Sequence, residues 1–255
     1  MFKEENQFWL YMVGIILLMI LSYFIVAGYQ FPFVGFLYDD SSDKAYEYKK
    51  APEMQLVPNK DYRAKIYTNK GLIELDLYED NAPMAVNNFV FLANAGYYDG
   101  VTFHRVVNDF IIQSGSRTSL DDKPDNDGLG GPGYVFDDEI NWVTLGLTSE
   151  QIKTLQSAGY SNDTGLVSKR LEKYSVAMAN AGPDTNGSQF FIVTAENSDP
   201  RLDQLQGRHT VFATVIGGQN VVEAIDSAQI ENATDDSISR PIGDYHIERV
   251  EIVAL

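Results

Sequence analysis

The sequence predicts a mainly β domain that is preceded by one long apolar helix. Short runs in which apolar and polar residues alternate recur through most of the chain, and few βαβ crossovers separate them, so a barrel or sandwich is favoured over a parallel sheet. A stretch without any charged residue, between Glu5 and Asp39, supplies the apolar helix. We therefore expect an apolar amino-terminal segment (1–38), a polar linker (39–61) and a β domain (62–255).

The apolar segment has the features of a membrane-spanning helix between Phe8 and Ala27. A helix of ~20 apolar residues covers ~30 Å, the thickness of the hydrocarbon core of a bilayer. A cleaved secretory signal has a shorter apolar region of about 7–15 residues behind a basic start, whereas this chain starts with FKEEN after Met1. We expect an uncleaved signal anchor, and a cleaved signal or a buried core helix stays open as an alternative.

The charges that flank this helix bear on its orientation. Lys3 is the only basic residue before it, which slightly favours a cytoplasmic amino terminus and an extracytoplasmic domain. We expect a single-pass protein of the bacterial cell envelope. The linker that follows is polar, contains Pro52 and Pro58 and has no helical or strand period, so it is expected to hold the domain away from the membrane.

Composition excludes several classes of function. The net charge of −17, from 36 acidic and 19 basic residues, argues against nucleic-acid binding, which needs clustered Lys and Arg. The absence of cysteine excludes a disulfide, a thiolate nucleophile and a zinc–thiolate site. No pair among the three histidines has the spacing of metal ligands, so we expect no metal.

The first elements of the β domain are a hairpin and a helix. The hairpin is predicted at 63–78, because Ile73, Leu75 and Leu77 alternate with acidic residues after the turn sequence Asn-Lys-Gly. In the helix, Asn81 is the expected N-cap, Pro83 lies in the first turn and Gly96 ends it. Further strands are predicted at Val101–Val107, Ser175–Met178, Gln189–Thr194, Thr210–Val215 and His246–Val253, and a second short helix at Asn220–Asp226.

One stretch, residues 141–173, interrupts this pattern with a helix signal of its own. Thr148 and Gln151 form a predicted capping box, and Gly159 ends the helix. We expect an insertion on the surface of the domain. Recruitment of a particular partner by this insertion is a hypothesis that rests on its placement alone.

Three segments have unusual composition: FHRVVNDFIIQSG at 103–115, MANAGPDTNGSQFFI at 178–192 and GRHTVFATV at 207–215. Each has an ordinary explanation, since Phe residues of a strand fill cores and Asn-Gly sequences form turns. Their joint occurrence, in this order, closely resembles the cyclophilin family. NNFVFLANAGYYDGVTFHR and GGPGYVFDDE (130–139) extend the resemblance over 62–255, apart from 141–173.

The resemblance implies a fold and an activity. The fold is an eight-stranded antiparallel β-barrel with two capping helices and a proline-binding groove on its outer face. The activity is peptidyl-prolyl cis-trans isomerisation, the rotation of X–Pro bonds in peptides and folding proteins. The partners would be proline-containing segments, and the catalytic domain is expected to act as a monomer without a cofactor.

The chemistry of this reaction agrees with the residue types present. Rotation is opposed by a barrier of ~18–20 kcal/mol because amide resonance resists twisting. No bond breaks, so no nucleophile or metal is needed. In the twisted state the prolyl nitrogen gains a lone pair, which a fixed cationic donor stabilises over either planar state. Arg105 matches the arginine of the family and is expected in this role, since a guanidinium stays charged and holds its donors in a rigid plane.

The other expected site residues follow from the resemblance. Phe110 completes the catalytic set, together with Gln113, which would orient the arginine and the peptide. The proline pocket and peptide groove are expected to include Ile111, Ala179, Asn180, Gln189, Phe191, Leu205 and His209. His104 is expected to be structural and to point away from the groove.

One loop departs from the family pattern. The segment SDPRLDQLQGRHTVF contains no tryptophan and is a few residues longer than usual, so either Leu202 or Leu205 could face the pocket. In the family that tryptophan contributes to tight binding of cyclosporin. We therefore expect weakened sensitivity to this inhibitor, with isomerase activity kept.

A binding module, which holds proline-containing segments as a chaperone without need of catalysis, is the competing hypothesis. Retention of Arg105, Phe110, Gln113 and Phe191 together favours the enzyme, because a mere binder has no need of the arginine.

Overall fold

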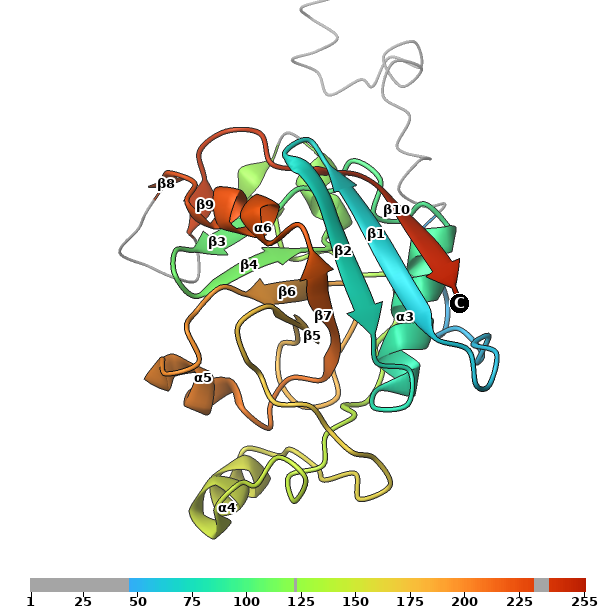
Figure 1. Cartoon of the computed structure of the whole chain (residues 1–255), viewed down its shortest axis with the longest axis vertical. Helices are drawn as coiled ribbons and strands as arrows, with labels where there is room; N and C mark the ends of the chain where they lie inside the picture. Colours follow the sequence, from blue (N-terminus) through green and yellow to red (C-terminus); the bar gives the residue numbers. More distant parts are fainter. Residues whose placement is uncertain (1–45, 122, 232–238) are drawn as a thin grey trace, which may run out of the picture. The chain divides into compact units, whose positions relative to one another are not determined.

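The computed structural model describes residues 46–121, 123–231 and 239–255 (Figure 1). The predicted membrane helix at 8–27 lies outside these residues. Within the described ranges, no helix is long and apolar enough to cross a bilayer. Residues from Tyr46 to Leu255 form one compact unit, and the fold below is that of this unit.

One antiparallel sheet of eight strands, in the order β10-β1-β2-β7-β5-β6-β4-β3, organises the described unit. Its strands are β1 (Tyr62–Thr68), β2 (Gly71–Leu77), β3 (Arg105–Val107), β4 (Ile111–Ser114), β5 (Ser175–Met178), β6 (Phe190–Val193), β7 (Val211–Gly217) and β10 (Ile247–Ala254). A separate small sheet pairs β8 (Ile230–Glu231) with β9 (Arg240–Pro241). The predicted hairpin and the strands at 175–178, 189–194, 210–215 and 246–253 are confirmed within about two residues.

The sheet curls without closing into the expected eight-stranded barrel. Its two edge strands, β10 and β3, do not pair with each other. Instead, the segment before β3 meets the start of β10 and the residues before it: the N–H of Phe103 donates to the carbonyl of Tyr245 at 2.8 Å, and the N–H of Ile247 donates to the carbonyl of Val101 at 2.8 Å. The predicted strand at 101–107 is reduced to three residues of β3, which are too few for a continuous ladder with β10.

Successive side chains of a strand point to opposite faces of the sheet, so the buried apolar residues form two separate clusters. The larger cluster fills the concave side of the sheet and includes the fully buried Ile66, Ile73 and Ile112. α3 (Pro83–Asn94) packs against β10 and β7 from this side, where the ring of Phe89 meets that of Phe190 edge-on with centroids 5.7 Å apart. The smaller cluster lies on the opposite face of β4, β5 and β6.

The two capping helices lie where the sequence predicted them. They are α3 and α6 (Gln219–Asp226), and α6 packs against β2, β3 and β4. The N-cap of α3 is Ala82 rather than the expected Asn81. Nδ2 of Asn81 instead donates a hydrogen bond to the carbonyl of Val167 in the insertion.

Residues 46–61, which we expected in the linker, lie against the domain. The N–H of Tyr48 donates to the carbonyl of Pro132 at 2.8 Å, and its ring meets that of Phe91 at 5.0 Å. The guanidinium of Arg117 lies 3.9 Å from the ring centroid of Tyr46. Because these aromatic side chains are anchored on the domain, the globular unit begins near residue 46 instead of residue 62.

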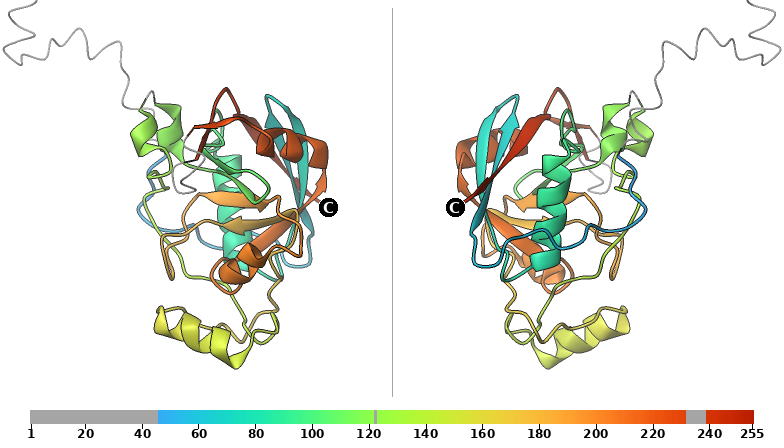
Figure 2. Two further views of the ribbon diagram at one scale, coloured as in Figure 1. Left: turned by 90° about the vertical axis from the view of Figure 1, so that its left-hand side faces the viewer. Right: turned by 90° about the vertical axis from the view of Figure 1, so that its right-hand side faces the viewer.

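The insertion at 141–173 contains α4 (Ser149–Ser157), which both views of Figure 2 place at the opposite end of the domain from α6. The predicted capping box is confirmed: the N–H of Gln151 donates to Oγ1 of Thr148 at 3.3 Å, and the N–H of Thr148 donates to Oε1 of Gln151 at 2.8 Å. A small core around Trp142 and Leu155 belongs to the insertion. A further helix, α5 (Pro200–Leu205), was not predicted; Asp199 caps it.

Candidate active site

A row of directly opposed residues crosses four strands on the outer face of the sheet. Arg105 of β3 is opposite Gln113 of β4, which is opposite Phe191 of β6, which is opposite Ala177 of β5. Opposed residues of an antiparallel pair point to the same side, so these four side chains share one face. Ile112, one residue away, points to the other side and is fully buried in the main core. The alternation of side chains along the FHRVVNDFIIQSG segment therefore places Arg105 and Gln113 on the outer face of the sheet.

A chain of hydrogen bonds holds the guanidinium of Arg105. Its Nη1 donates to Oε1 of Gln113 at 2.9 Å, and Nε2 of Gln113 donates to Oε1 of Gln189 at 3.0 Å. Nε2 of Gln189 donates to the carbonyls of Gly128 at 2.7 Å and Gly130 at 2.9 Å. Because carbonyls can only accept, they fix the amide of Gln189, which in turn fixes the amide of Gln113 with its oxygen toward the arginine. Backbone carbonyls thus set the position of the cation.

An apolar cluster lies beside this chain. Phe110, Ile111 and Phe191 pack together in it, with Ala179 and Leu205 partly buried against them. Leu202 is 3% exposed and belongs to the interior of the cluster, whereas Leu205 is half-buried and reaches a surface hollow. Of the two leucines considered from the sequence, Leu205 is therefore the one available to a ligand.

The ring of His209 stands edge-on to that of Phe191, with centroids 5.2 Å apart and planes at 89°. Its Nδ1 lies 3.1 Å from the carbonyl oxygen of Met178. Burial, opposed in part by that hydrogen bond, lowers the pKa of His209 to about 4. The imidazole is therefore uncharged near neutral pH, which suits the wall of a pocket for an apolar proline ring.

Two hollows flank the site and meet at Asn180 and Ala181, which line both. One, of about 340 Å³, is lined by Gln113, Ala179, Asn180 and Gln189 together with the loop at 128–135. The other, of about 830 Å³, is lined by Asn180, Leu205 and His209 together with residues of α4 and α5. Six of the ten predicted site residues therefore line these hollows, and two more, Phe191 and Arg105, contact a residue that lines them.

Asn180 is positioned by its own side chain, which leaves its backbone at the junction of the hollows. Its Nδ2 donates to the carbonyl of Arg208 at 2.8 Å and to Oδ1 of Asp138 at 3.3 Å. Asp138 also accepts from the side chain of Asn186 at 2.8 Å and from the N–H of Asp184 at 3.0 Å. Burial raises the pKa of Asp138, although these hydrogen bonds counteract the shift. Sequence reasoning noted the GGPGYVFDDE segment but assigned no role to this carboxylate.

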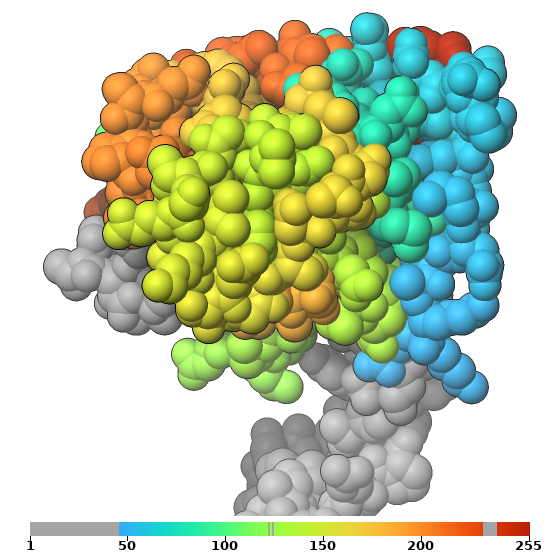
Figure 3. All heavy atoms as spheres, turned by 90° about the horizontal axis from the view of Figure 1, so that it is seen from below, coloured from blue at the N-terminus to red at the C-terminus, as the bar shows by residue number. Residues whose placement is uncertain are grey.

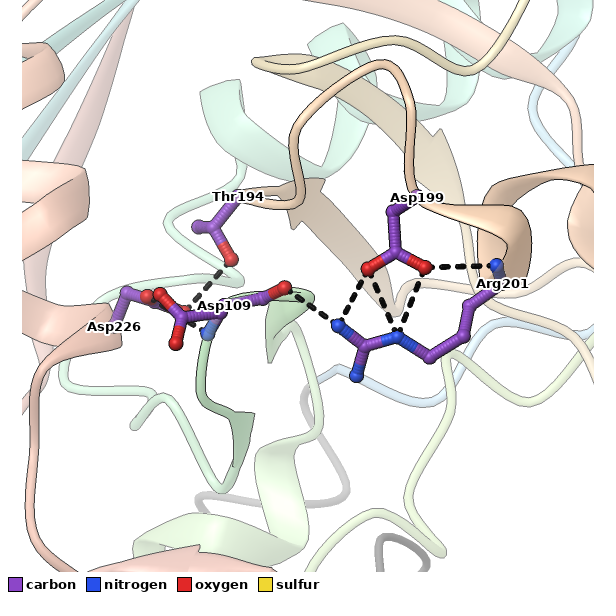
Figure 4. A network of polar contacts seen from close by, with 5 residues as sticks. All are labelled: Asp109, Thr194, Asp199, Arg201 and Asp226. Carbon is purple, nitrogen blue, oxygen red and sulfur yellow. Dashed lines mark hydrogen bonds and ion pairs between the residues drawn. The ribbon is translucent and has the colours of Figure 1, made fainter.

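A second arginine covers the ring of Phe110. The guanidinium carbon of Arg201 lies 4.3 Å from the ring centroid of Phe110. Figure 4 shows how it is held: Nε donates to Oδ2 of Asp199 at 3.0 Å, and Nη2 donates to the backbone carbonyl of Asp109 at 2.8 Å. Asp199 and Arg201 lie about 90 residues from Phe110 in the chain, and no local pattern in the sequence predicts this contact.

The turn that carries Phe110 is fixed from its other side by Asp226. The carboxylate of Asp226 accepts from the N–H of Asp109 at 3.1 Å and from the hydroxyl of Thr194 at 2.7 Å (Figure 4). The N–H groups of Thr194 and Ala195 both donate to the carbonyl of Phe110, at 2.9 and 3.1 Å. His104, expected to be structural, is 7% exposed and lines neither hollow; burial lowers its pKa to about 4.

The chain is similar to known proteins over this whole unit. The sequence profile of the family described as "Cyclophilin type peptidyl-prolyl cis-trans isomerase/CLD" matches residues 63–252. Peptidyl-prolyl cis-trans isomerase CYP18-2 of Arabidopsis thaliana is 38% identical over 189 residues, which are 73% of this chain and 90% of that protein. Peptidyl-prolyl cis-trans isomerase B of Streptomyces anulatus is 36% identical over 206 residues, 74% of this chain and 95% of that protein.

Solved structures agree with these relatives. A crystal structure of a cyclophilin type peptidyl-prolyl cis-trans isomerase of Cryptosporidium parvum has a TM-score of 0.55 and 28% identity, covering 76% of this chain and 98% of that one. The structure of that protein in the presence of the dipeptide Ala-Pro has a TM-score of 0.54. Fold, site and relatives together define an X–Pro isomerase. The chain belongs to the cyclophilin-type peptidyl-prolyl cis-trans isomerase family.

Proposed function

We propose that Arg105 is the catalytic group and that it stabilises the pyramidal prolyl nitrogen of a twisted X–Pro bond. The observation that carries this proposal is the hydrogen-bond chain from the carbonyls of Gly128 and Gly130 through Gln189 and Gln113 to the guanidinium. A donor that is held in place before the reaction needs no reorganisation when the lone pair develops, so it favours the transition state over the planar ground states.

The substrate is a proline-containing peptide or a folding polypeptide. The apolar cluster of Phe110, Ile111 and Phe191 offers the proline ring a surface beside the guanidinium, and the uncharged His209 and Leu205 border it. The Asn180 backbone lies where the two hollows meet and is available to an extended peptide. The Cryptosporidium relative studied in the presence of Ala-Pro supports this substrate class.

The test is isomerase activity of the full chain in detergent, compared with Arg105→Ala and Arg105→Lys. We expect the alanine variant to lose about 100-fold or more in kcat, the magnitude seen when a preorganised donor is removed. The lysine variant keeps the charge but not the planar donors and should recover only part of the activity. Equal turnover by the parent and the alanine variant would remove Arg105 from the mechanism, whereas no acceleration by the folded parent would leave a proline-binding module.

We propose in addition that the protein assists folding on the outer side of a bacterial cytoplasmic membrane, anchored by the apolar run from Phe8 to Ala27. The length of that run and the absence of charge between Glu5 and Asp39 support this placement. The test is carbonate extraction of membranes, followed by protease treatment of intact spheroplasts. Retention in the pellet with digestion of the domain is expected; release by carbonate, or protection from protease, would contradict it.

A further inference from the structure

The larger hollow is bounded in large part by the insertion, which the proposed catalytic chemistry does not use. α4 contributes Glu150, Gln151 and Thr154 to its lining, and the end of α5 contributes Asp203 and Leu205. Its volume of about 830 Å³ lies in the range of ligand-binding clefts, which is roughly 300–1,000 Å³. Seen from below, the yellow-green and yellow atoms of the insertion occupy much of this face of the molecule, beside the orange atoms of α5 (Figure 3).

The insertion is fastened to the loop that carries the pocket residues. Nε1 of Trp142, which is 2% exposed, donates to the carbonyl of Gly207 at 3.2 Å. A Cβ atom at Gly207 would lie 2.8 Å from Cδ1 of both Leu147 and Leu155, and the φ of Gly207 is +78°, so this close approach requires glycine.

A second attachment lies next to the first. The buried side chain of Gln206 accepts from the N–H of Leu171 at 3.1 Å and donates to its carbonyl at 2.8 Å. Both ends of the insertion are therefore fixed to the 206–207 segment. The walls of the hollow are formed before any ligand arrives, which lowers the entropic cost of binding.

The hollow is continuous with the candidate active site. Asn180, Leu205 and His209 line it and also belong to the predicted peptide groove. A polypeptide chain whose proline lies on the apolar cluster therefore has its neighbouring residues at the entrance of this hollow.

The charges of the lining favour a cationic ligand. Two exposed carboxylates, of Glu150 on α4 and Asp203 on α5, line the hollow against one guanidinium, of Arg208. Arg208 lies near the ring of Tyr160, 5.7 Å from its centroid, and the contact of Asp203 with Arg170 is 4.0 Å long and exposed, so it neutralises the carboxylate weakly. The protein as a whole carries a net charge of −17 and adds to this negative potential.

We propose that the hollow between α4 and α5 is a subsite for the segment of substrate polypeptide that flanks the X–Pro bond, and that it selects basic side chains. This inference rests on the proposed function, since it takes the site beside it as the proline site. The insertion then acts as a specificity element beside the proline site.

The test compares binding of three fluorescent peptides to the full chain in detergent, by anisotropy, with isomerase turnover measured in parallel. One peptide is a short X–Pro tetrapeptide; the other two are twelve-residue versions with Lys or with Glu on both flanks. We expect the Lys-flanked peptide to bind about 5–10-fold more tightly than the Glu-flanked one, and the difference to shrink at high salt.

The decisive variant is Glu150→Gln with Asp203→Asn. It should remove most of the preference for Lys and leave binding and turnover of the tetrapeptide unchanged. The matched control, Glu248→Gln with Asp61→Asn, removes two exposed carboxylates elsewhere and should keep the preference. Equal binding of the two long peptides by the parent, or an equal loss of preference in both double variants, would overturn the proposal. Absence of tetrapeptide turnover would count against the proposed function alone, because the binding comparison does not need catalysis.

Discussion

Nη1 of Arg105 lies 2.9 Å from Oε1 of Gln113, and the two residues stand directly opposite each other in the register of β3 and β4. The register of these two strands therefore sets the position of the Arg105 guanidinium. The orientation of the Gln113 amide is dictated in turn by Gln189 and by two backbone carbonyls behind it. The site therefore owes its geometry to main-chain groups that the fold itself holds in place.

Gln113 is expected to act as a positioning residue. Gln113→Leu keeps a similar volume but removes both hydrogen bonds, so the guanidinium loses its anchor; we expect kcat to fall about 10- to 100-fold with KM changed less than threefold. Steady-state kinetics on an X–Pro peptide measures the split. Gln113→Glu offers Arg105 an acceptor again and should recover more activity than leucine. Loss through KM alone would show that Gln113 binds substrate instead.

Arg201 is expected to support the pocket through Phe110. Arg201→Met keeps a long apolar stem over the ring but removes the charge and the hydrogen bonds to Asp199 and Asp109. Because the guanidinium is partly exposed, we expect stability to fall by only about 1 kcal/mol or less, while KM for a proline peptide rises about threefold. Thermal unfolding and peptide titration of Arg201→Met and Arg201→Lys check this. An unchanged KM in the methionine variant would show that Arg201 does not support peptide binding through Phe110.

Glu139 gives the domain a pH dependence of known sign. Its carboxylate accepts from the N–H groups of Met84 and Ala85 at 2.8 and 2.9 Å, in the first turn of α3, and burial raises its pKa to about 7 from the ordinary 4.5. Between these values the folded state keeps a proton that the unfolded state has released. The stability contributed by the protonated group is therefore present below pH 4.5 and is lost as the pH rises toward 7.

Comparison with Glu139→Gln isolates this effect, because the other titrating groups are common to both proteins. The free energy of unfolding of the parent minus that of the variant should decrease by on the order of 3 kcal/mol between pH 4.5 and 7.5. Urea unfolding at four pH values measures the difference. A difference that stays constant with pH would mean that Glu139 titrates normally.

The loop at 198–212 should weaken inhibition by cyclosporin. It contains no tryptophan, and the one tryptophan of the described residues, Trp142, is buried in the small core of the insertion. Leu205 is half-buried and lines the larger hollow. We expect Leu205→Trp to strengthen inhibition at least several-fold with turnover changed little, in an assay that titrates the inhibitor against both proteins. Equal inhibition of this protein and a tryptophan-containing relative would contradict the expectation.

Local patterns in the sequence predicted much of this fold. The alternation of Ile73, Leu75 and Leu77 marked a strand, and Thr148 with Gln151 marked a capped helix, because each signal lies within one element. Residues 46–61 are held on the domain by isolated aromatic anchors such as Tyr46 and Tyr48. These anchors give the sequence no helical or strand period, so the sequence alone predicts a linker there. The open edge between β3 and β10 depends on pairing between distant segments and could not be seen locally.

The same distinction holds for the site. Arg105, Gln113 and Phe191 were found because they lie in continuous motifs, and strand register then aligned them. Asp138 and Arg201 were missed because their roles exist only through tertiary contacts, with Asn180 and with Phe110. The hollow beside the insertion could not be predicted from the sequence for the same reason, since its walls come from segments that meet only in the folded chain.

The central claim is tested most directly by exchange NMR on a labelled X–Pro peptide saturated with the full chain in detergent, which measures the cis–trans rate on the enzyme apart from binding. The parent should interconvert the bound peptide at least about 100-fold faster than Arg105→Ala, while both bind it with dissociation constants within a few-fold of each other. Equal rates on the two proteins would contradict the account and would leave Arg105 a residue of the binding surface alone.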